Sequence, residues 1–324
     1  MGNIKRVGVL TSGGDAPGMN AAVRAVARTC VHNNIECLGI KRGYNGLISG
    51  DFMQLDNINV SGIMRLGGTV LYTARCDEFM TKEGREKAKV TCKYLGIDAL
   101  IVIGGDGTFR GAQAFAEHGV GAIGIPATID NDIACSHYTI GFDTACNTAV
   151  ECIDKLRDTM LAHERCSVVE VMGRHAGHLA LYVAIACGAT AVLVPERESD
   201  IENNIIERIR RSRIGGRTHF VIIVAEGAAC PAHSVSEKIK DELGIEPKVT
   251  ILGHIQRGGA PTARDRVTAS RLGQYAVDLA LEGKLGRVVA MRGGEIVDYE
   301  INEALAMTKD LQESMYDNMK VVSW

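Results

Sequence analysis

The residues with the clearest capacity for chemistry lie within residues 100–132, where glycines and aspartates follow two apolar runs. The first run, residues 100–103, ends in the sequence GGDGT at residues 104–108. Glycines at such a turn allow backbone N–H groups to approach a ligand closely. A helix that begins there also directs the positive end of its dipole at the same point. The turn therefore predicts a binding site for phosphate groups.

Three carboxylates accompany this turn. Asp106 lies within it, and Asp130 and Asp132 follow the second apolar run in the sequence PATIDND. Ligands of parallel α/β sheets bind at the carboxyl ends of the strands, so these acids are expected beside the phosphate. Carboxylates repel a phosphate unless a cation such as Mg²⁺ lies between them, which indicates metal-dependent phosphoryl transfer. Any one Asp or Gly here could instead cap a helix or stay solvated, so the prediction rests on the whole set.

Other charged turns are ambiguous when taken alone. The sequence TSGGDAPG at residues 11–18 is a second glycine turn, of a kind also found in α/β proteins that bind nothing there. Arg75 follows a Gly-Gly-Thr turn, and Arg174 lies in the turn MGRHAG. Each arginine could be a surface charge or a fork for phosphate oxygens. Arg24 and Arg28, four residues apart in a predicted helix, favour a solvated stripe.

The elements that must position these residues alternate between strands and helices. Apolar runs predict strands at residues 7–10, 36–40, 100–103, 121–125, 167–171, 191–194, 220–225, 249–252, 287–291 and 295–297. Periodicity predicts helices at residues 20–32, 59–66, 81–95, 144–164, 201–213, 235–243 and 263–282, and one after the GGDGT turn. Residues 43–46 are predicted as a loop. This alternation indicates mostly parallel sheets with helices on both faces.

Composition excludes several classes of protein. The 324 residues are 46% hydrophobic and 23% charged, which is an ordinary globular composition long enough for two domains. The net charge of −3 provides no field that favours nucleic acid or an anionic membrane. The longest apolar run, residues 179–195, is short for a membrane span and is predicted as a buried helix followed by a buried strand.

The first residues and the cysteines predict a cytoplasmic protein. The sequence MGNIKRVGVLTSGG carries charge where a signal peptide needs an apolar core, so it is predicted to contain the first strand. The ten cysteines form no CxxC pair, and most lie in apolar runs. They are predicted to be reduced core residues.

Many motifs occur in the order and spacing of one known family, from residue 7 to residue 266. They are TSGGDAPGMNAA, GGT(x)LYTARC, GGDGT, TIDND, GFDTA, EVMGRHAGH, AEG and LGHIQRGG(x)PTA(x)DR. The chain thereby resembles the bacterial-type ATP-dependent 6-phosphofructokinases (phosphofructokinase A family). The resemblance implies two Rossmann-like three-layer αβα domains with mostly parallel sheets and an active site in the cleft between them. The ATP-binding domain would be residues 1–141 plus 256–304, and the fructose 6-phosphate-binding domain residues 142–255 plus 305–324.

The resemblance also implies a reaction. The γ-phosphoryl group of ATP would be transferred to the 1-hydroxyl of D-fructose 6-phosphate, giving fructose 1,6-bisphosphate and ADP in glycolysis. Asp130 matches the family's catalytic base. The residues that match stabilisers of the transferring group are Thr128, Arg75 and Arg174. Asp106 and Asp132 match the residues that serve Mg²⁺.

Binding residues follow from the same motifs. Positions that match ATP contacts are Gly14, Tyr44, Arg75, Cys76, Gly105, Asp106, Gly107, Thr108 and Gly111. Positions that match sugar-phosphate contacts are Thr128, Asp130, Arg165, Met172, Gly173, Arg174, Glu226, Lys248, His254 and Arg257. Arg165 and Lys248 match residues that reach in from a neighbouring subunit, so the resemblance implies a homotetramer with shared sites. Without the family, Arg165 would be interpreted as a cation at a helix C-terminus.

Two active-site positions depart from the family pattern. Lys248 stands where Arg is usual, which exchanges a bidentate fork for a point charge and so affects how a phosphate is held. Ala127 stands where Gly is usual, a change that still leaves room beside the phosphates.

An allosteric site for ADP or phosphoenolpyruvate is implied with more departures. The matching or roughly matching positions are Arg24, Arg28, Arg157, Gly188, Arg217 and His219. However, Thr190 replaces a Glu thought to coordinate the effector's metal, and Thr218 replaces a Lys. Gly215 falls near an expected Arg, and Gly62 and Leu66 also differ. We therefore expect weakened or altered effector control.

Three alternative functions were weighed. A pyrophosphate-dependent phosphofructokinase of the same fold would tend to carry Asp in place of Gly107 and Lys in place of Ala127, and both residues here are small and neutral. Lipid and NAD kinases share GGDGT but lack the GHIQRGG and MGRHAGH elements. A nucleotide-binding regulatory subunit without turnover is opposed by the intact Asp106, Asp130 and Arg174.

Overall fold

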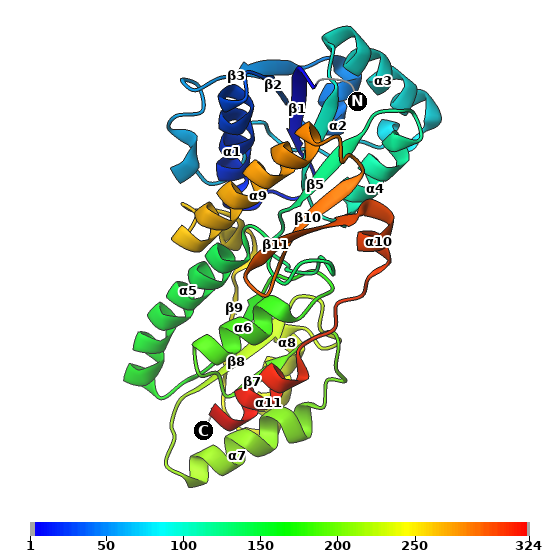
Figure 1. The fold of residues 1–324 in the computed structure, drawn as a ribbon. Helices are drawn as coiled ribbons and strands as arrows, with labels where there is room; N and C mark the ends of the chain where they lie inside the picture. Colours follow the sequence, from blue (N-terminus) through cyan, green and yellow to red (C-terminus); the bar gives the residue numbers. More distant parts are fainter. Residues whose placement is uncertain (1–3, 323–324) are drawn as a thin grey trace. The chain divides into compact units, whose positions relative to one another are not determined.

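A computed structural model describes residues 4–322 of the chain, which divides into two compact units, each with its own sheet (Figure 1). Unit 1 comprises the described residues up to Ile129, Ile133–Thr144 and Arg257–Lys309. Unit 2 comprises Asp130–Asp132, Ala145–Gln256 and the described residues from Asp310 onward. The chain therefore passes between the units several times.

Unit 1 contains a seven-stranded sheet with the order β11-β10-β5-β4-β1-β2-β3. The strands are β1 (Arg6–Thr11), β2 (Glu36–Ile40), β3 (Phe52–Leu55), β4 (Ala99–Gly104), β5 (Ala122–Pro126), β10 (Arg287–Arg292) and β11 (Glu295–Glu300). The strands from β10 to β2 pair in parallel, whereas the edge strands β3 and β11 are antiparallel to their neighbours. The prediction of a mostly parallel sheet is confirmed.

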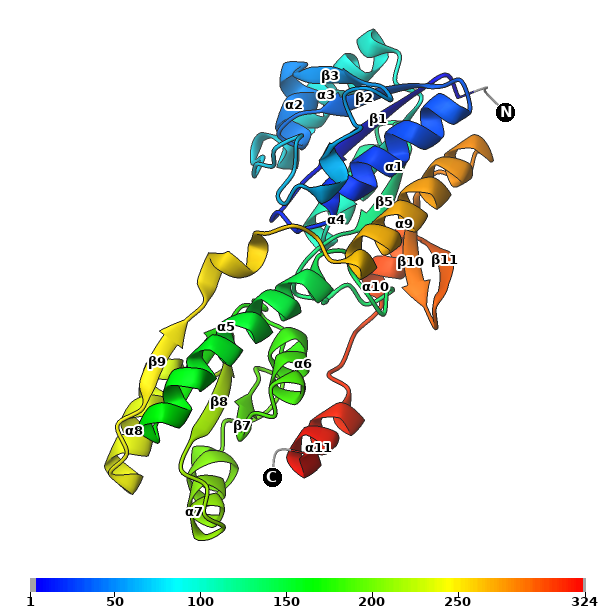
Figure 2. The same ribbon diagram turned by 90° about the vertical axis from the view of Figure 1, so that its left-hand side faces the viewer.

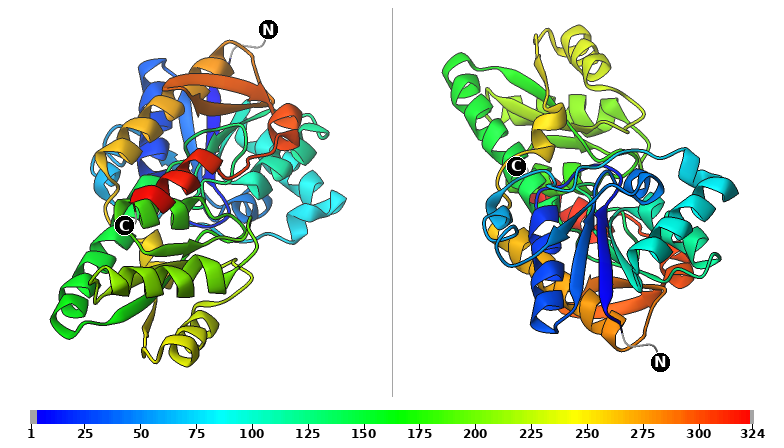
Figure 3. Two further views of the ribbon diagram at one scale, coloured as in Figure 1. Left: turned by 90° about the horizontal axis from the view of Figure 1, so that it is seen from below. Right: turned by 90° about the horizontal axis from the view of Figure 1, so that it is seen from above.

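Helices cover both faces of this sheet. On one face, α1 (Met19–His32) packs against α9 (Ala263–Leu281), as Figures 2 and 3 show. The other face carries α2 (Tyr44–Ser49), α3 (Lys82–Leu95), α4 (Asp106–Ala116) and α10 (Ile301–Ala306), with the 3-10 turn Glu78–Met80. A second 3-10 turn, Ile63–Arg65, packs on α1. Successive strand residues point to opposite faces, so a central strand covered on both sides needs an unbroken apolar run. This explains why all six residues of β4 are buried.

Unit 2 contains a four-stranded sheet with the order β7-β8-β6-β9, and all its pairings are parallel. Its strands are β6 (Cys166–Val171), β7 (Ala191–Leu193), β8 (Phe220–Ala225) and β9 (Lys248–Ile251). One face shares a core with the π-helical turn Glu202–Ile206, α7 (Glu207–Ile214) and α8 (Ala232–Leu243). The other face carries α6 (His178–Ala186), on which α11 (Glu313–Val322) packs. The 3-10 turn Gly253–Arg257 follows β9, and α5 (Phe142–His163) begins in unit 1 and continues into unit 2.

Two predictions about local structure were wrong, and one strand was missed. The expected loop at residues 43–46 is the start of α2, where a Cβ at Gly46 would lie only 1.9 Å from the carbonyl oxygen of Lys41. That glycine allows close packing rather than a flexible turn. The expected helix at residues 59–66 is only a 3-10 turn, and the short edge strand β3, half exposed, was missed.

Burial agrees with two other predictions. Seven of the ten cysteines are buried, and Cys76, Cys152 and Cys230 are half-buried. Residues 179–195 form α6 and β7 rather than one long helix. Across the described residues 4–322, the structure has no helix with the length and apolar character that crossing a membrane requires.

Phe115 on α4 tests the core of unit 1. Its side chain is fully buried and meets the Phe79 ring edge-on, with ring centroids 5.3 Å apart. We expect Phe115→Ala to lower the free energy of unfolding by about 3–5 kcal/mol through lost burial and a cavity. Urea unfolding followed by circular dichroism measures it. Tyr94→Ala on α3, where the side chain is 88% exposed, is the control and should change stability by less than about 0.5 kcal/mol.

Candidate active-site residues

The carboxyl ends of three strands in unit 1 meet at one edge of the sheet. The register aligns Thr11 with Ile103 and Gly104 with Pro126. Beyond the strands, the Ser12 N–H donates to the Ile103 carbonyl at 3.0 Å, and the Ala127 N–H to the Gly104 carbonyl at 3.0 Å. The turns after β1, β4 and β5 therefore leave the sheet side by side, as ligand-binding turns of α/β sheets do.

Thr108 joins the two glycine turns. Its hydroxyl donates to the Ser12 carbonyl at 3.2 Å, and its side chain is 3% exposed. A Cβ at Gly104 would lie 2.4 Å from both the Ser12 carbonyl oxygen and Thr108 Oγ1. Gly104 is thus required by this close approach. Because α4 begins at Asp106, the positive end of its dipole is directed at the joined turns.

The buried side chain of Tyr44 packs against the GGDGT turn. Its hydroxyl donates to the Thr108 carbonyl at 2.6 Å, and its ring stacks on Phe79 with centroids 4.0 Å apart. Burial raises the pKa of Tyr44, so the hydroxyl stays protonated and can donate. A Cβ at Gly111 would lie 2.7 Å from this ring. Tyr44 and Gly111 therefore support the turn from beneath.

Arg75 lies against the first turn of α2, and Cys76 follows it in the chain. The Asn45 side-chain amide donates to the Arg75 carbonyl at 2.9 Å, which fixes the backbone while the guanidinium is exposed. Cys76 is half-buried, and burial is the main cause that raises the pKa of its thiol. The thiol is therefore neutral at pH 7 and would contribute a contact surface rather than a nucleophile.

The three aspartates belong to different units. Asp106, the first residue of α4 in unit 1, is exposed, whereas Asp130 and the half-buried Asp132 belong to unit 2. Asp130 is only 6% exposed. Between the last two, Asn131 adopts a φ of +51°, a left-handed conformation that non-glycine residues rarely hold. Such strain often accompanies functional sites, since the surrounding structure must enforce it.

The carboxylates suit a metal that is shared with a substrate. Among residues 4–322, the structure contains no group of three or more His, Cys, Asp or Glu side chains that could hold a metal ion. Mg²⁺ rarely uses an all-protein cage and is usually bound by one or two carboxylates together with substrate phosphates. The carboxylates of Asp106, in unit 1, and Asp132, in unit 2, are each oxygen ligands of the kind that Mg²⁺ prefers.

Unit 2 gathers a second group of predicted residues where β6 and β8 end side by side at Val171 and Ala225. Glu226 Oε1 accepts hydrogen bonds from the backbone N–H groups of Gly173, at 3.3 Å, and Arg174, at 2.7 Å. Arg174 has a φ of +55° and an exposed side chain. Glu226 thus fixes the strained turn that presents the Arg174 guanidinium.

Gln256, which sequence reasoning missed, connects this turn to the residues after β9. Its amide is fully buried, accepts from the Met172 N–H at 3.3 Å and donates to the Gly253 carbonyl at 3.1 Å. The exposed His254 lies within the turn that Gln256 holds. The sequence held one signal for this role, because Gln256 is a polar residue within the HIQRGG motif to which no ligand was assigned.

Arg165 and Lys248 lie at the amino ends of the unit 2 strands, whereas Arg174 lies beyond their carboxyl ends. Arg165 precedes β6, and Lys248, the first residue of β9, is paired with Ser167 at the start of β6. Since a strand advances about 3.3 Å per residue, Lys248 lies roughly 13 Å and Arg165 roughly 20 Å along the strand direction from Val171, where β6 ends before the Arg174 turn. Both side chains are exposed. Within one chain, the structure does not bring them to the Arg174 group.

Arg257 lies against the first glycine turn of unit 1. Its Nη1 donates to the Asp15 carbonyl at 3.1 Å and would lie 2.8 Å from a Cβ at Gly14. Gly14 therefore leaves room for this guanidinium. Arg257 is half-buried and supplies a positive charge at the turn.

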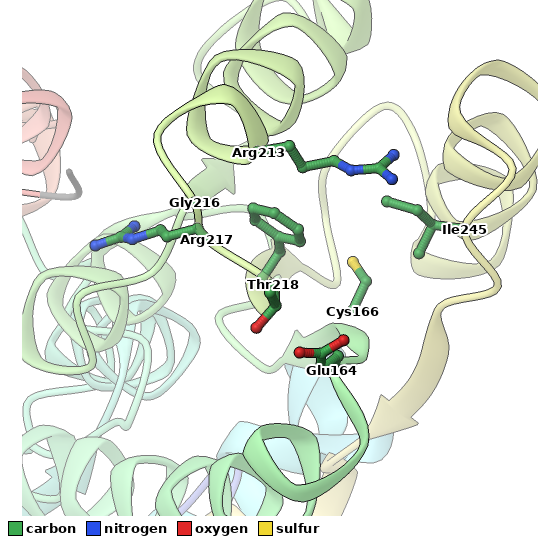
Figure 4. A pocket seen from close by; sticks show the side chains of 8 residues that line it. Glu164, Cys166, Arg213, Gly216, Arg217, Thr218 and Ile245 are labelled. Atoms are coloured by element: carbon green, nitrogen blue, oxygen red, sulfur yellow. The ribbon is translucent and has the colours of Figure 1, made fainter.

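Some of the predicted allosteric residues gather in unit 2. Arg157 donates to the Cys187 carbonyl next to Gly188. Burial lowers the pKa of His219, and the positive charges of Arg157 and Arg217 lower it further. A pocket of about 280 Å³ lies nearby, lined by Arg217, Thr218, Arg213, Glu164 and Cys166 among others (Figure 4). This part of unit 2 is therefore strongly basic.

The other predicted allosteric residues differ in their surroundings. Burial lowers the pKa of Arg24 on α1, with a further contribution from Arg28, which itself donates to the Asn57 carbonyl at 3.4 Å. Thr190 is 4% exposed, and its carbonyl accepts from Arg208 at 3.0 Å. A buried neutral hydroxyl lacks the negative charge that a carboxylate would offer to a metal ion.

The fold and these turns define a class: an α/β protein of two units whose parallel strands end in glycine and arginine turns suited to phosphate groups. A family model described as phosphofructokinase matches residues 6–280. A protein of Bacillus subtilis strain 168 named ATP-dependent 6-phosphofructokinase is 52% identical over 320 residues, which cover 99% of this chain and all of that one. A protein of the same name from Clostridium botulinum strain Loch Maree is 49% identical with the same coverage.

A solved structure is also similar. The phosphofructokinase of Pichia pastoris, described as in the T-state, superposes with a TM-score of 0.93 at 35% identity. The match covers 100% of this chain but only 39% of the yeast chain. The chain belongs to the phosphofructokinase family.

Two glycines of the site allow a test of which ones the fold requires. A Cβ at Gly227 would lie 2.1 Å from the Arg174 carbonyl oxygen, whereas a Cβ at Gly107 would meet nothing within 4 Å. We expect Gly227→Ala to cost about 1–3 kcal/mol of stability through steric overlap. Gly107→Ala, in the first turn of α4, should stabilise by up to about 1 kcal/mol. Thermal unfolding distinguishes them, and equal effects would contradict this interpretation.

Proposed function

We propose that this chain is an ATP-dependent 6-phosphofructokinase, which transfers the γ-phosphoryl group of ATP to the 1-hydroxyl of D-fructose 6-phosphate in glycolysis. The observation that carries the proposal is the pair of glycine turns joined by Thr108 at the amino end of α4. Backbone N–H groups and a helix dipole there suit a chain of phosphates. The names of relatives about 50% identical over the whole chain supply the reaction.

The nucleotide is proposed to bind on unit 1. The contacts would come from Gly14, Tyr44, Arg75, Cys76, Gly105, Asp106, Gly107, Thr108 and Gly111. The open space beside Gly107 supports a nucleoside triphosphate as donor, because an Asp there would fill that space with negative charge. Tyr44 and Gly111 would act by supporting the turn, since the Tyr44 hydroxyl is already bonded to Thr108.

Asp130 is proposed to take the proton from the 1-hydroxyl as the sugar oxygen attacks. Its low solvent exposure suits a general base, because little water can compete with the sugar hydroxyl for the carboxylate. Thr128, Arg75 and Arg174 would stabilise the charge on the transferring phosphoryl group. Asp106 and Asp132 would hold Mg²⁺ against the ATP phosphates, where the ion neutralises charge that otherwise repels the incoming oxygen.

The sugar phosphate is proposed to bind Met172, Gly173, Arg174, Glu226, His254 and Arg257, with Arg165 and Lys248 supplied by a neighbouring copy. Glu226 Oε1 is used by two backbone N–H groups, so Oε2 is the oxygen offered to a sugar hydroxyl. Arg165 and Lys248 lie at the amino ends of the strands, away from the Arg174 turn at the carboxyl ends. This separation supports a shared site, since one phosphate cannot contact both ends of the strands. A homotetramer follows from the family resemblance.

The domain roles are part of the same proposal. Residues 1–141 with 256–304 would form the ATP-binding domain, and residues 142–255 with 305–324 the fructose 6-phosphate-binding domain. A glycolytic role is consistent with a cytoplasmic location, which we propose.

A coupled assay with fructose 6-phosphate and MgATP tests the reaction. Wild-type protein should turn over, and Asp130→Ser should lower kcat by roughly 10²–10⁴-fold because the base is lost. Pyrophosphate in place of ATP should give no turnover. Wild-type activity with pyrophosphate alone would refute the choice of donor, and an unaffected Asp130→Ser variant would refute the assignment of the base.

Effector control should be weakened or altered. Thr190 supplies no carboxylate to a metal carried by the effector, and Gly215 and Thr218 reduce the basic charge, although Arg157, Arg217 and His219 remain. We expect ADP and phosphoenolpyruvate to shift the fructose 6-phosphate saturation curve little. Thr190→Glu should increase any response to ADP. A strong, family-like shift by both effectors in the wild-type protein would contradict this proposal.

A further inference from the structure

Asp265 is a fully buried carboxylate to which the proposed function gives no role. It lies in the first turn of α9, where its own N–H donates to the N-cap hydroxyl of Thr262 at 3.3 Å. The dipole of α9 favours negative charge at this position. Burial raises the pKa of Asp265, so its hydrogen bonds are needed to keep the carboxylate charged.

Both oxygens of Asp265 accept from residues more than 120 positions away in the sequence. Oδ1 accepts from the Tyr138 hydroxyl at 2.6 Å and from the Gly141 N–H at 2.7 Å. Oδ2 accepts from the Thr144 N–H at 2.9 Å and from the Thr144 hydroxyl at 2.5 Å. Gly141 and Thr144 flank the start of α5 at Phe142, so Asp265 accepts backbone N–H groups at the N-terminal end of α5 as a capping residue does.

The segment that Asp265 holds is bonded directly to the strand end that carries Thr128. The Ile140 N–H donates to the Pro126 carbonyl at 3.1 Å, and the Thr139 hydroxyl donates to the Thr128 carbonyl at 2.7 Å. The same segment packs on the first glycine turn, where a Cβ at Gly141 would lie 2.6 Å from Ala16 Cβ. Asp265, the turn at residues 138–144 and Thr128 therefore form one continuous network within unit 1.

We propose that Asp265 is a positioning residue for phosphoryl transfer, which caps α5 and α9 together and thereby fixes Thr128 for the transferring group. This inference rests on the proposed function. Thr128 is expected to contact the transferring phosphoryl group more strongly in the transition state than in the bound substrate, so its displacement should affect kcat more than KM.

Asp265→Asn keeps the shape of the side chain but replaces one accepting oxygen with a donating NH₂ group. Two of the four groups that donate to Asp265 are backbone N–H groups, which cannot accept a hydrogen bond from that NH₂. The Gly141 N–H is directed at Oδ1 and the Thr144 N–H at Oδ2, so either orientation of an amide places its NH₂ against a donor. We expect kcat per folded protein to fall roughly 100-fold, with little change in KM for either substrate. In a Thr128→Ala background the same substitution should cost much less.

Single-donor variants keep the test valid if Asp265→Asn does not fold. Tyr138→Phe and Thr144→Val each remove one hydroxyl donor and should lower kcat several-fold in folded protein. Tyr275→Phe is the matched control on α9, because it removes a 2.9 Å bond to Asp298 elsewhere in unit 1 and should leave kcat unchanged.

The outcomes separate this inference from the proposed function. Wild-type protein without turnover would refute the proposed function. If the wild-type protein is active but Tyr138→Phe and Thr144→Val keep the wild-type kcat, the proposed function stands and only the role of Asp265 is refuted. The same holds if Asp265→Asn costs the same factor with and without Thr128.

Discussion

The parallel register of β1, β4 and β5 is the constraint on which the rest of unit 1 depends. Because Thr11, Ile103 and the Gly104–Pro126 pair are aligned, three loops must leave the sheet at one edge within hydrogen-bond distance. Backbone carbonyls there can be satisfied only by neighbouring turns, as the Ser12 and Gly104 carbonyls are. This crowding leaves no room for a side chain at residue 104. The GGDGT motif thus contains two kinds of glycine: Gly104 is required by packing, whereas a Cβ at Gly107 would meet no other atom of the protein within 4 Å.

In both units, buried neutral or hydrogen-bonded groups hold the exposed charged ones in place. Thr108 and Gln256 are nearly or fully buried, while Asp106, Arg174 and His254 are exposed. An exposed arginine on a mobile backbone would lose much conformational entropy when it binds a ligand. Glu226 reduces that loss by fixing the backbone of Arg174 at a strained φ, which restricts where the guanidinium can reach. The charges are thus oriented through the backbone, and their ends stay accessible to a ligand.

The sequence predicted most elements because both sheets are covered on two faces, so that central strands such as β4 and β8 are continuous apolar runs with little ambiguity. It failed where exposure or close packing removed that signal. β3 is a short, partly exposed edge strand, and α2 was hidden by Gly43 and Gly46, which serve packing there. Candidate site residues inside contiguous motifs could be named from sequence, but their supports could not. Gln256 and Asp265 act on partners 84 and 121 or more residues away, and no local pattern specifies such pairing.

The unit 2 sheet also limits how a single chain could bind a sugar phosphate. Arg174 and Glu226 lie at the carboxyl ends of its strands, and Arg165 and Lys248 lie at the amino ends, with the strands between them. If all four belong to the binding site, as proposed above, the second pair would come from another copy, and each copy would supply one pair to its own site and the other to a neighbour. Such an arrangement couples affinity to the geometry of association. Lys248 then matters beyond its charge, because a flexible ammonium transmits less orientation across an interface than a planar guanidinium fork would.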